Sequence, residues 1–474
     1  MSRTARLLQA GLLTVALAAL AVPAGINAAP AFLAPVKTES PLPAAQQPPS
    51  SLSQVTAIGN LSQDAPQPNA AQLSTLLEAN LNSPAGSFTG QVMDAQSKEV
   101  LYSRNADLPV IPGSNLKLLT AMSALKNLGT ETRFSTKVLR GSQPNELILQ
   151  AGGDVLLSSG SSDADLVNGR AGLLSLAQLT AKALGSVSGP VSIVVDDSMF
   201  SGPALSPEWQ AEDVAAGQIA PIYPMALNAA QPEAGSAAGR PQDSALAVGQ
   251  AFSAALAKQG VKVADEVTRL ESDNSTPSAG STGDAKELAK VDSATVAEQV
   301  NYMLANSDNY LAEVLARMAA VKQGKAGDFT SAISTTQETV KALGIDTEGL
   351  ELVDNCGLAI KDRISAAQLS QVIHVMTTDP DPSLHSALNG LPIAGLTGTL
   401  SGRYNNPTTA DGAGLVRAKT GTLNTVLTLS GYVVDRDGRL LVFSFMANDL
   451  NGGPLTAQPV LDKSAAVLAG CGCR

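Results

Sequence analysis

The sequence has few aromatic residues and no excess of positive charge. The first shortage limits how a core can be built, and the second limits the kind of partner. Aromatic residues make up 3% of the 474 residues while 44% are apolar, so a core must be built mainly from alanine, leucine and valine. The net charge of −11 and the isoelectric point of about 4.8 argue against a nucleic-acid partner, because phosphate binding needs a basic surface. The length allows two or three domains.

Cysteine and histidine are also scarce. Cys356, Cys471 and Cys473 allow one disulfide bridge with one thiol left over, and the sequence does not choose the pair. No two cysteines have CxxC spacing, and only His374 and His385 could add nitrogen ligands. We therefore expect no metal site.

The first 28 residues have the parts of a signal peptide. Arg3 and Arg6 precede an apolar run over 7–22, and Ile26-Asn27-Ala28 ends in the small residue that a signal peptidase requires. We expect cleavage after Ala28, with an uncleaved membrane anchor as the alternative. Either outcome places the remaining chain outside the cytoplasm, in a secreted, periplasmic or cell-wall associated form.

Composition divides the rest of the chain into three kinds of region. Residues 29–70 are rich in proline, alanine, serine and glutamine, which predicts a flexible linker. Over 141–290, short strand-like and helical runs alternate with loops rich in glycine, serine and proline, which predicts one or more inserted domains. The flanking residues, 71–140 and 291–474, would then form one catalytic domain.

The flanking regions predict a single β-sheet assembled from both ends of the chain, with helices between its two halves. The expected strands cover 86–94, 99–104, 414–419, 425–434 and 439–447. The expected helices cover 71–80, 114–128, 293–304, 310–320 and 461–468. The fold class is therefore α/β (α+β).

A Pro-Gly turn delivers Ser114 onto the first turn of an apolar helix, three residues before Lys117. Residues i and i+3 share a helix face, so the Lys117 amine can reach the Ser114 hydroxyl as a base reaches a nucleophile. Unpaired N–H groups and the helix dipole favour negative charge at this helix start. Histidine is not favoured as the base, because neither His374 nor His385 is near a GxSxG elbow and the chain has no such elbow.

The S-x-x-K pattern also occurs at Ser123 and Lys126. Ser123 lies nine residues after Ser114, which places it in mid-helix and about half a turn around the axis. We expect Ser123 to be a surface or packing serine and choose Ser114 as the nucleophile.

Ser307-Asp308-Asn309 lies in the break between two expected helices, and Ser272-Asp273-Asn274 repeats the pattern in a loop of small polar residues. A catalytic serine and amide need rigid support, so we choose Ser307 and Asn309. In isolation the tripeptide would be interpreted as a helix cap.

The third motif, Lys419-Thr420-Gly421-Thr422, is expected at the end of a strand. Gly421 allows close approach of a backbone, as when a peptide lies along an edge strand. Lys419 supplies positive charge, and Thr420 and Thr422 supply hydroxyls, all suited to a substrate carboxylate.

The ordered set S-x-x-K, S-x-N and K-T-G resembles the active-site serine penicillin-recognising enzymes. The 193 residues between Ser114 and Ser307 make the chain similar to the D-alanyl-D-alanine carboxypeptidase/endopeptidase family of low-molecular-mass penicillin-binding proteins, in which a large insertion separates the first two motifs. One departure is Asp354-Asn355-Cys356-Gly357, where Asp-Gly-Ser-Gly is expected. Further matches are Gly152-Gly153-Asp154, Phe200-Ser201-Gly202-Pro203 with Trp209, Ala220-Pro221, Gly357-Leu358, Arg363-Ile364-Ser365, Leu391-Pro392-Ile393-Ala394-Gly395 and Gly398-Thr399-Leu400.

The resemblance implies a penicillin-binding transpeptidase-like fold, with an antiparallel five-stranded sheet flanked by helices and a mixed α/β insertion. It also implies an acyl-enzyme route. Lys117, with a pKa lowered by Lys419 and partial burial, would take the proton of Ser114 as the serine attacks the carbonyl between two D-alanines. The backbone N–H groups of Ser114 and Thr422 would form the oxyanion hole.

In the same implied route, Ser307 relays a proton to the leaving amine and Asn309 holds the amide on the acyl side. Lys419, Thr420 and Thr422, beside Gly421, bind the terminal carboxylate. No metal or organic cofactor is needed.

The implied partners are peptidoglycan peptides, with β-lactam antibiotics as inhibitors that acylate Ser114. A β-lactamase is the alternative enzyme, although the glutamate that a class A enzyme adds between the second and third motifs is not identifiable. A non-catalytic cell-wall binding protein is the other alternative, and loss of a catalytic residue would be its signature. Substrate preference between crosslinks and terminal D-alanines, the contacts of the insertion, membrane retention and oligomeric state are open at this stage.

Overall fold

The structure is a computed structural model that describes residues 64–185, 187–232, 239–270 and 285–471. The expected signal peptide, most of the expected linker and the alternative tripeptide Ser272-Asp273-Asn274 lie outside these residues. Among the described residues, none of the helices combines the length and the apolar character needed to span a membrane.

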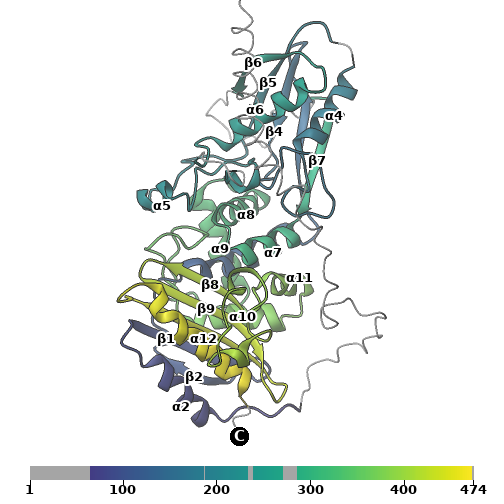
Figure 1. Ribbon diagram of the computed structural model, residues 1–474. Coiled ribbons are helices and arrows are strands. Elements are labelled where there is room, and N and C mark those ends of the chain that lie inside the picture. Colours follow the sequence, from purple (N-terminus) through teal and green to yellow (C-terminus); the bar gives the residue numbers. More distant parts are fainter. Residues whose placement is uncertain (1–63, 186, 233–238, 271–284, 472–474) are drawn as a thin grey trace, which may run out of the picture. The chain divides into compact units, whose positions relative to one another are not determined.

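Five strands from the two ends of the chain form one antiparallel sheet in the order β2-β1-β10-β9-β8 (Figure 1). They are β1 (Ser87–Asp94), β2 (Val100–Arg104), β8 (Arg417–Leu423), β9 (Val426–Val434) and β10 (Leu440–Asn448). β1 pairs with β10 from Ser87 opposite Asn448 to Asp94 opposite Leu441, so strands far apart in sequence are neighbours. The prediction of a five-stranded antiparallel sheet built from both chain ends is confirmed.

Helices cover both faces of this sheet. Side chains alternate along β10, and Leu441, Phe443 and Phe445 pack with α2 (Ala70–Leu81) and α12 (Pro454–Gly470). Val442 and Met446 belong to the core on the opposite face. The helices of that core are α3 (Lys117–Leu128), α7 (Val296–Asn306), α8 (Asn309–Lys322), α9 (Phe329–Ala342), α10 (Ala366–Thr378) and α11 (Pro382–His385). Every residue of β10 is buried as a result.

A second, mixed sheet has the order β6-β5-β4-β3-β7. Its strands are β3 (Arg133–Arg140), β4 (Glu146–Gln150), β5 (Val191–Asp196), β6 (Val263–Arg269) and β7 (Glu287–Thr295). β3 is antiparallel to β4 and β7, whereas β5 is parallel to β4 and β6. With α4 (Leu173–Leu184) and α6 (Ser244–Ala257) this sheet encloses a core of its own.

The second sheet extends beyond the expected insertion limits of 141 and 290, because β3 begins at Arg133 and β7 ends at Thr295. The helix expected from 293 starts later, since Thr295 is the N-cap of α7 and forms a capping box with Glu298. We therefore propose 133–295 as the inserted region.

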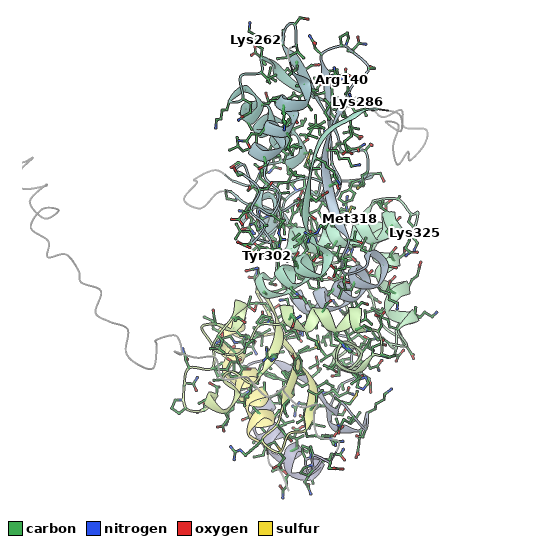
Figure 2. The ribbon with its side chains drawn as sticks, turned by 90° about the vertical axis from the view of Figure 1, so that its right-hand side faces the viewer. Arg140, Lys262, Lys286, Tyr302, Met318 and Lys325 are labelled. Carbon is green, nitrogen blue, oxygen red and sulfur yellow. The ribbon has the colours of Figure 1, made fainter. Side chains whose placement is uncertain are left out.

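The inserted region packs on the helices of the other part. Figure 2 shows Arg140, Lys262 and Lys286 at one end of the second sheet, away from Tyr302 of α7 and Met318 of α8. Gly153 faces Met318 so closely that a Cβ there would lie 2.6 Å from the Met318 sulfur. The loop after β4 therefore rests directly on α8.

Candidate active site

Ser114 lies in a single 3-10 turn, η2 (Gly113–Leu116), immediately before α3. The sequence predicted an α-helical turn here, but a 3-10 turn also aligns residues i and i+3, so Lys117 still faces Ser114. Glycines crowd the turn: a Cβ on Gly421 would lie 3.0 Å from Ser114 N, and one on Gly357 would lie 1.9 Å from Gly113 O. Only residues without a Cβ allow the two neighbouring backbones to approach the serine this closely.

The Lys117 amine has three hydrogen-bond partners. Its Nζ lies 2.9 Å from Ser114 Oγ, 2.6 Å from Asn309 Oδ1 and 2.6 Å from the backbone oxygen of Cys356. The lysine is fully buried, and this burial lowers the pKa of its amine from the ordinary value.

The cause of that pKa shift differs in part from the sequence-based prediction. Burial of Lys117 is complete rather than partial, and it is the main cause of the lowered pKa. The charges of nearby Asp354, Asp308 and Glu313 act in the opposite direction and raise the pKa of Lys117. Removal from water therefore lowers the pKa of the Lys117 amine, and the acidic groups around it oppose this shift.

Ser307 and Lys419 form a second pair across the site. Ser307 ends α7 in the left-handed region, with φ 57° and ψ 37°, a conformation that costs a non-glycine residue about 1–3 kcal/mol. Lys419 Nζ donates to Ser307 Oγ at 2.9 Å and to the backbone oxygen of Thr420 at 2.7 Å. Burial first, and then the charge of Lys117, lower the pKa of Lys419 well below its ordinary value.

The tripeptide Ser307-Asp308-Asn309 caps a helix and also contributes to the site. Asp308 accepts a hydrogen bond from Leu311 N at 2.8 Å and so caps α8. Asn309 directs its Oδ1 to Lys117 and donates from Nδ2 to the backbone oxygen of Gln218 at 2.9 Å. The cap thus holds the Asn309 amide at the first position of a buried helix.

The third motif, Lys419-Thr420-Gly421-Thr422, lies inside the edge strand β8. The sequence had predicted it at the end of a strand. The strand continues because Thr420, Gly421 and Thr422 pair with Leu429, Thr428 and Leu427 of β9. Thr428 Oγ1 also donates to the backbone oxygen of Pro112 at 2.8 Å, which ties the serine turn to the sheet.

A cavity of about 390 Å³ opens beside Ser114. Five of the predicted site residues line it, namely Ser114, Ser307, Asn309, Thr420 and Thr422. Lys117 and Lys419 lie behind their serine partners, and Gly421 packs against the serine turn. The structure therefore brings all eight predicted residues together.

Several cavity residues were not predicted as site residues, and Gln218 and Thr399 are two of them. Gln218 comes from the inserted region, and Thr399 Oγ1 lies 2.7 Å from Thr420 Oγ1. Thr399 stands in Gly398-Thr399-Leu400, which the sequence analysis noted as a family match without a role. The partner of Asn309 is a backbone oxygen of Gln218, for which no side chain gives a signal.

The family model for the D-Ala-D-Ala carboxypeptidase 3 (S13) family matches residues 73–240 and 229–467. The chain belongs to this S13 family. It is 35% identical over 415 residues to carboxypeptidase DacB of Mycolicibacterium smegmatis, covering 86% of each chain. It is 32% identical over 411 residues to Carboxypeptidase Rv3627c of Mycobacterium tuberculosis, covering 86% of this chain and 85% of that one.

Penicillin binding protein 4 of Haemophilus influenzae has the same fold as this S13 chain, with a TM-score of 0.64 at 19% identity, covering 85% of this chain and 98% of that one. The predicted family and fold are thus confirmed. The S13 chain is a serine-type D-Ala-D-Ala carboxypeptidase, of a family that acts on cell-wall peptidoglycan and hence outside the cytoplasm.

Asp354 organises a buried turn of the S13 enzyme that the sequence analysis did not recognise as part of the site. Its carboxylate accepts hydrogen bonds from the backbone N–H groups of residues 356–359 and from the Trp209 indole. This turn supplies the Cys356 carbonyl that contacts Lys117. Because the contact uses the backbone, the cysteine in place of the expected serine leaves it intact.

Glu313, Asp354 and Cys356 of the S13 enzyme place possible metal-ligand atoms within 4.8 Å of one another. They do not fit a metal site, because a carboxylate has about four lone-pair positions and Asp354 already accepts five N–H groups. Cys356 is a free thiol, and its burial raises its pKa well above the ordinary value. Cys471 is disulfide-bonded, and Cys473 lies outside the described residues.

Proposed function

We propose that this carboxypeptidase cleaves the D-Ala-D-Ala bond of peptidoglycan stem peptides through an acyl-enzyme on Ser114. The observation that carries the proposal is the Lys117 amine, fully buried and 2.9 Å from Ser114 Oγ. A buried amine beside a hydroxyl is an activated base beside a nucleophile. The same chemistry is open to D-Ala-D-X crosslinks.

In the first step, Lys117 takes the proton as Ser114 Oγ attacks the carbonyl carbon. The backbone N–H groups of Ser114 and Thr422 would bind the oxyanion, a contribution of roughly 3–4 kcal/mol per donor. The turn that carries Ser114 lies close to β8, which supports this role. A Cβ on Gly113 would lie 3.4 Å from Thr422 N, and one on Gly421 would lie 3.0 Å from Ser114 N.

In the second step, Ser307 relays the proton taken up by Lys117 to the amine of the leaving D-alanine, and water then hydrolyses the acyl-enzyme. Lys419, Thr420 and Thr422 would bind the carboxylate of that D-alanine. The second N–H of the Asn309 amide would hold the carbonyl on the acyl side, since only one is used by Gln218. These roles require no metal or organic cofactor.

The proposed partners are stem peptides and β-lactams, and no nucleic acid. Penicillin binding protein 4 of Haemophilus influenzae has been solved with a β-lactam, which supports acylation of this chain by the same class of compound. We propose export with cleavage after Ala28, and a membrane-associated form if that segment is kept.

The proposal is tested by peptide mapping of the purified protein after incubation with benzylpenicillin. We expect a stable adduct on the peptide that carries Ser114. No adduct with intact penicillin would contradict the enzyme and favour a non-catalytic binding protein. No adduct with consumed penicillin would indicate a β-lactamase.

Thr399 should assist carboxylate binding, because its hydroxyl contacts that of Thr420 at 2.7 Å. We expect Thr399→Val to raise KM for a peptide ending in D-Ala-D-Ala by roughly 3- to 10-fold with little change in kcat, the loss of one hydrogen bond. Thr408→Val is a matched control, because within the described part of the chain that exposed hydroxyl hydrogen-bonds only to Asn406 in its own loop. A KM equal to that of the unchanged protein would contradict the role of Thr399.

A further inference from the structure

The inserted region reaches the catalytic lysine by two hydrogen-bonded routes. Trp209 Nε1 donates to Asp354 Oδ2 at 3.0 Å, and the backbone oxygen of Gln218 accepts from Asn309 Nδ2 at 2.9 Å. Both residues belong to the short segment 209–218, which contains the helix α5 (Ala211–Ala215). One surface segment thus lies behind both acceptors that hold the lysine.

Asp354 connects the Trp209 hydrogen bond to the Cys356 carbonyl that contacts Lys117. Its Oδ1 accepts from the N–H groups of Cys356 and Gly357 at 3.0 and 2.6 Å, and its Oδ2 from those of Leu358 and Ala359 at 3.0 and 2.9 Å. The residue is fully buried, so water cannot replace a lost donor. The carboxylate therefore fixes the orientation of the turn over residues 356–359, and with it the direction in which the Cys356 carbonyl points.

The two acceptors decide how a neutral amine is oriented. A neutral Lys117 has two hydrogens and one lone pair. Asn309 Oδ1 and Cys356 O, each 2.6 Å from Nζ, can only accept, so they take the two hydrogens. The lone pair is then left for Ser114 Oγ, which can donate its proton.

We propose that Trp209 is a positioning residue, which acts through Asp354 and the Cys356 carbonyl to direct the lone pair of Lys117 at Ser114. The inference rests on the proposed function, in which Lys117 is the base. Trp209 is not among the residues that line the cavity, so it acts without touching substrate. The inserted region thereby becomes part of the catalytic apparatus of this enzyme.

The indole N–H can be removed without removing the ring. The Trp209 ring packs edge-to-face on Phe329, with centroids 5.3 Å apart, and Trp209→Phe keeps an aromatic ring for this contact. Purified protein is titrated with labelled benzylpenicillin to count acylable sites, and hydrolysis of a peptide ending in D-Ala-D-Ala is then measured per site. We expect kcat per site to fall by roughly 10- to 100-fold, the cost of a misplaced catalytic group, with KM within about twofold.

Phe329→Leu is the matched variant, because it removes the ring contact and leaves the indole N–H. A purely structural role for Trp209 predicts that both variants lose thermal stability and that neither loses kcat per titrated site. The inference is overturned if Trp209→Phe keeps its kcat per site, or if Phe329→Leu loses as much kcat as Trp209→Phe. If the unchanged protein itself is neither acylated nor active, the proposed function has failed instead.

Discussion

Replacing Ser114 by alanine is expected to lower kcat by roughly 10⁶-fold, the loss measured when a serine hydrolase loses its nucleophile. The change removes one oxygen and leaves the 3-10 turn, the glycine contacts and the cavity in place. Hydrolysis of a D-Ala-D-Ala peptide and labelling by penicillin are measured together, and both should disappear. Folding should be retained, because the Ser114 hydroxyl contacts only the lysine among the hydrogen bonds of the described residues.

Ser123→Ala is the matched control for Ser114→Ala. Ser123 begins the second S-x-x-K pattern, is fully buried in α3, and accepts a hydrogen bond from the Asn127 amide at 3.3 Å. We expect it to keep full activity. An acylated Ser114→Ala variant, or an inactive Ser123→Ala variant, would mean that the wrong serine has been chosen.

Replacing Lys117 by methionine is expected to lower the acylation rate by roughly 10²- to 10⁴-fold, the usual contribution of a general base. Methionine fills most of the buried space but leaves Asn309 Oδ1 and Cys356 O without the donor they have now. Each unpaired buried acceptor should cost about 1–3 kcal/mol of stability, so a lower Tm is also expected. Acylation is followed by stopped-flow mixing with a chromogenic β-lactam.

The pH dependence distinguishes a base from a merely structural lysine. A base acts only when unprotonated, so kcat/KM should rise with pH as Lys117 loses its proton, with a midpoint below the ordinary 10.5 because burial lowers the pKa. The groups that face it are Lys419, Asp354, Asp308, Glu313 and Cys356. In Lys117→Met this rise should vanish.

Lys126→Met is the control for Lys117→Met. Lys126 ends the second S-x-x-K pattern, is 47% exposed and pairs with Asp381 at 2.9 Å on the surface. Its removal should leave both the rate and the pH profile unchanged. A Lys117→Met variant that acylates at the rate of Lys126→Met would exclude Lys117 as the base.

Local chemistry allowed the three motifs to be found before their geometry was known. Ser114 and Lys117 are three residues apart on one turn, and Ser307 and Asn309 flank a helix cap, so each pair is placed by backbone rules alone. The same rules guided the choice of Ser114 over Ser123 and of Ser307 over Ser272. That these pairs meet beside β8 depends on the topology of the sheet. The strand pattern predicted one sheet built from both chain ends, and the resemblance supplied its antiparallel five-stranded form.

Groups that act through the backbone could not be found from the sequence. The carbonyls of Cys356 and Gln218 contact Lys117 and Asn309, yet any residue type offers a carbonyl at those positions. Trp209 was noted as a family match and Asp354 as part of a stretch that departs from the family pattern, but their hydrogen bond joins residues 145 positions apart. Neither β3 nor β7 was predicted as a strand, so the inserted region was given the narrower limits of 141 and 290.

The pairing of β1 with β10 has a consequence for how the chain is made. The ribosome releases Ser114 long before Thr422, and β1 has no partner at its inner edge until the last strand, ending at Asn448, has emerged. An unfinished chain would therefore carry the proposed nucleophile without the proposed oxyanion donor from β8. Such long-range pairing also slows folding, and the sheet can be completed only after β10 has emerged.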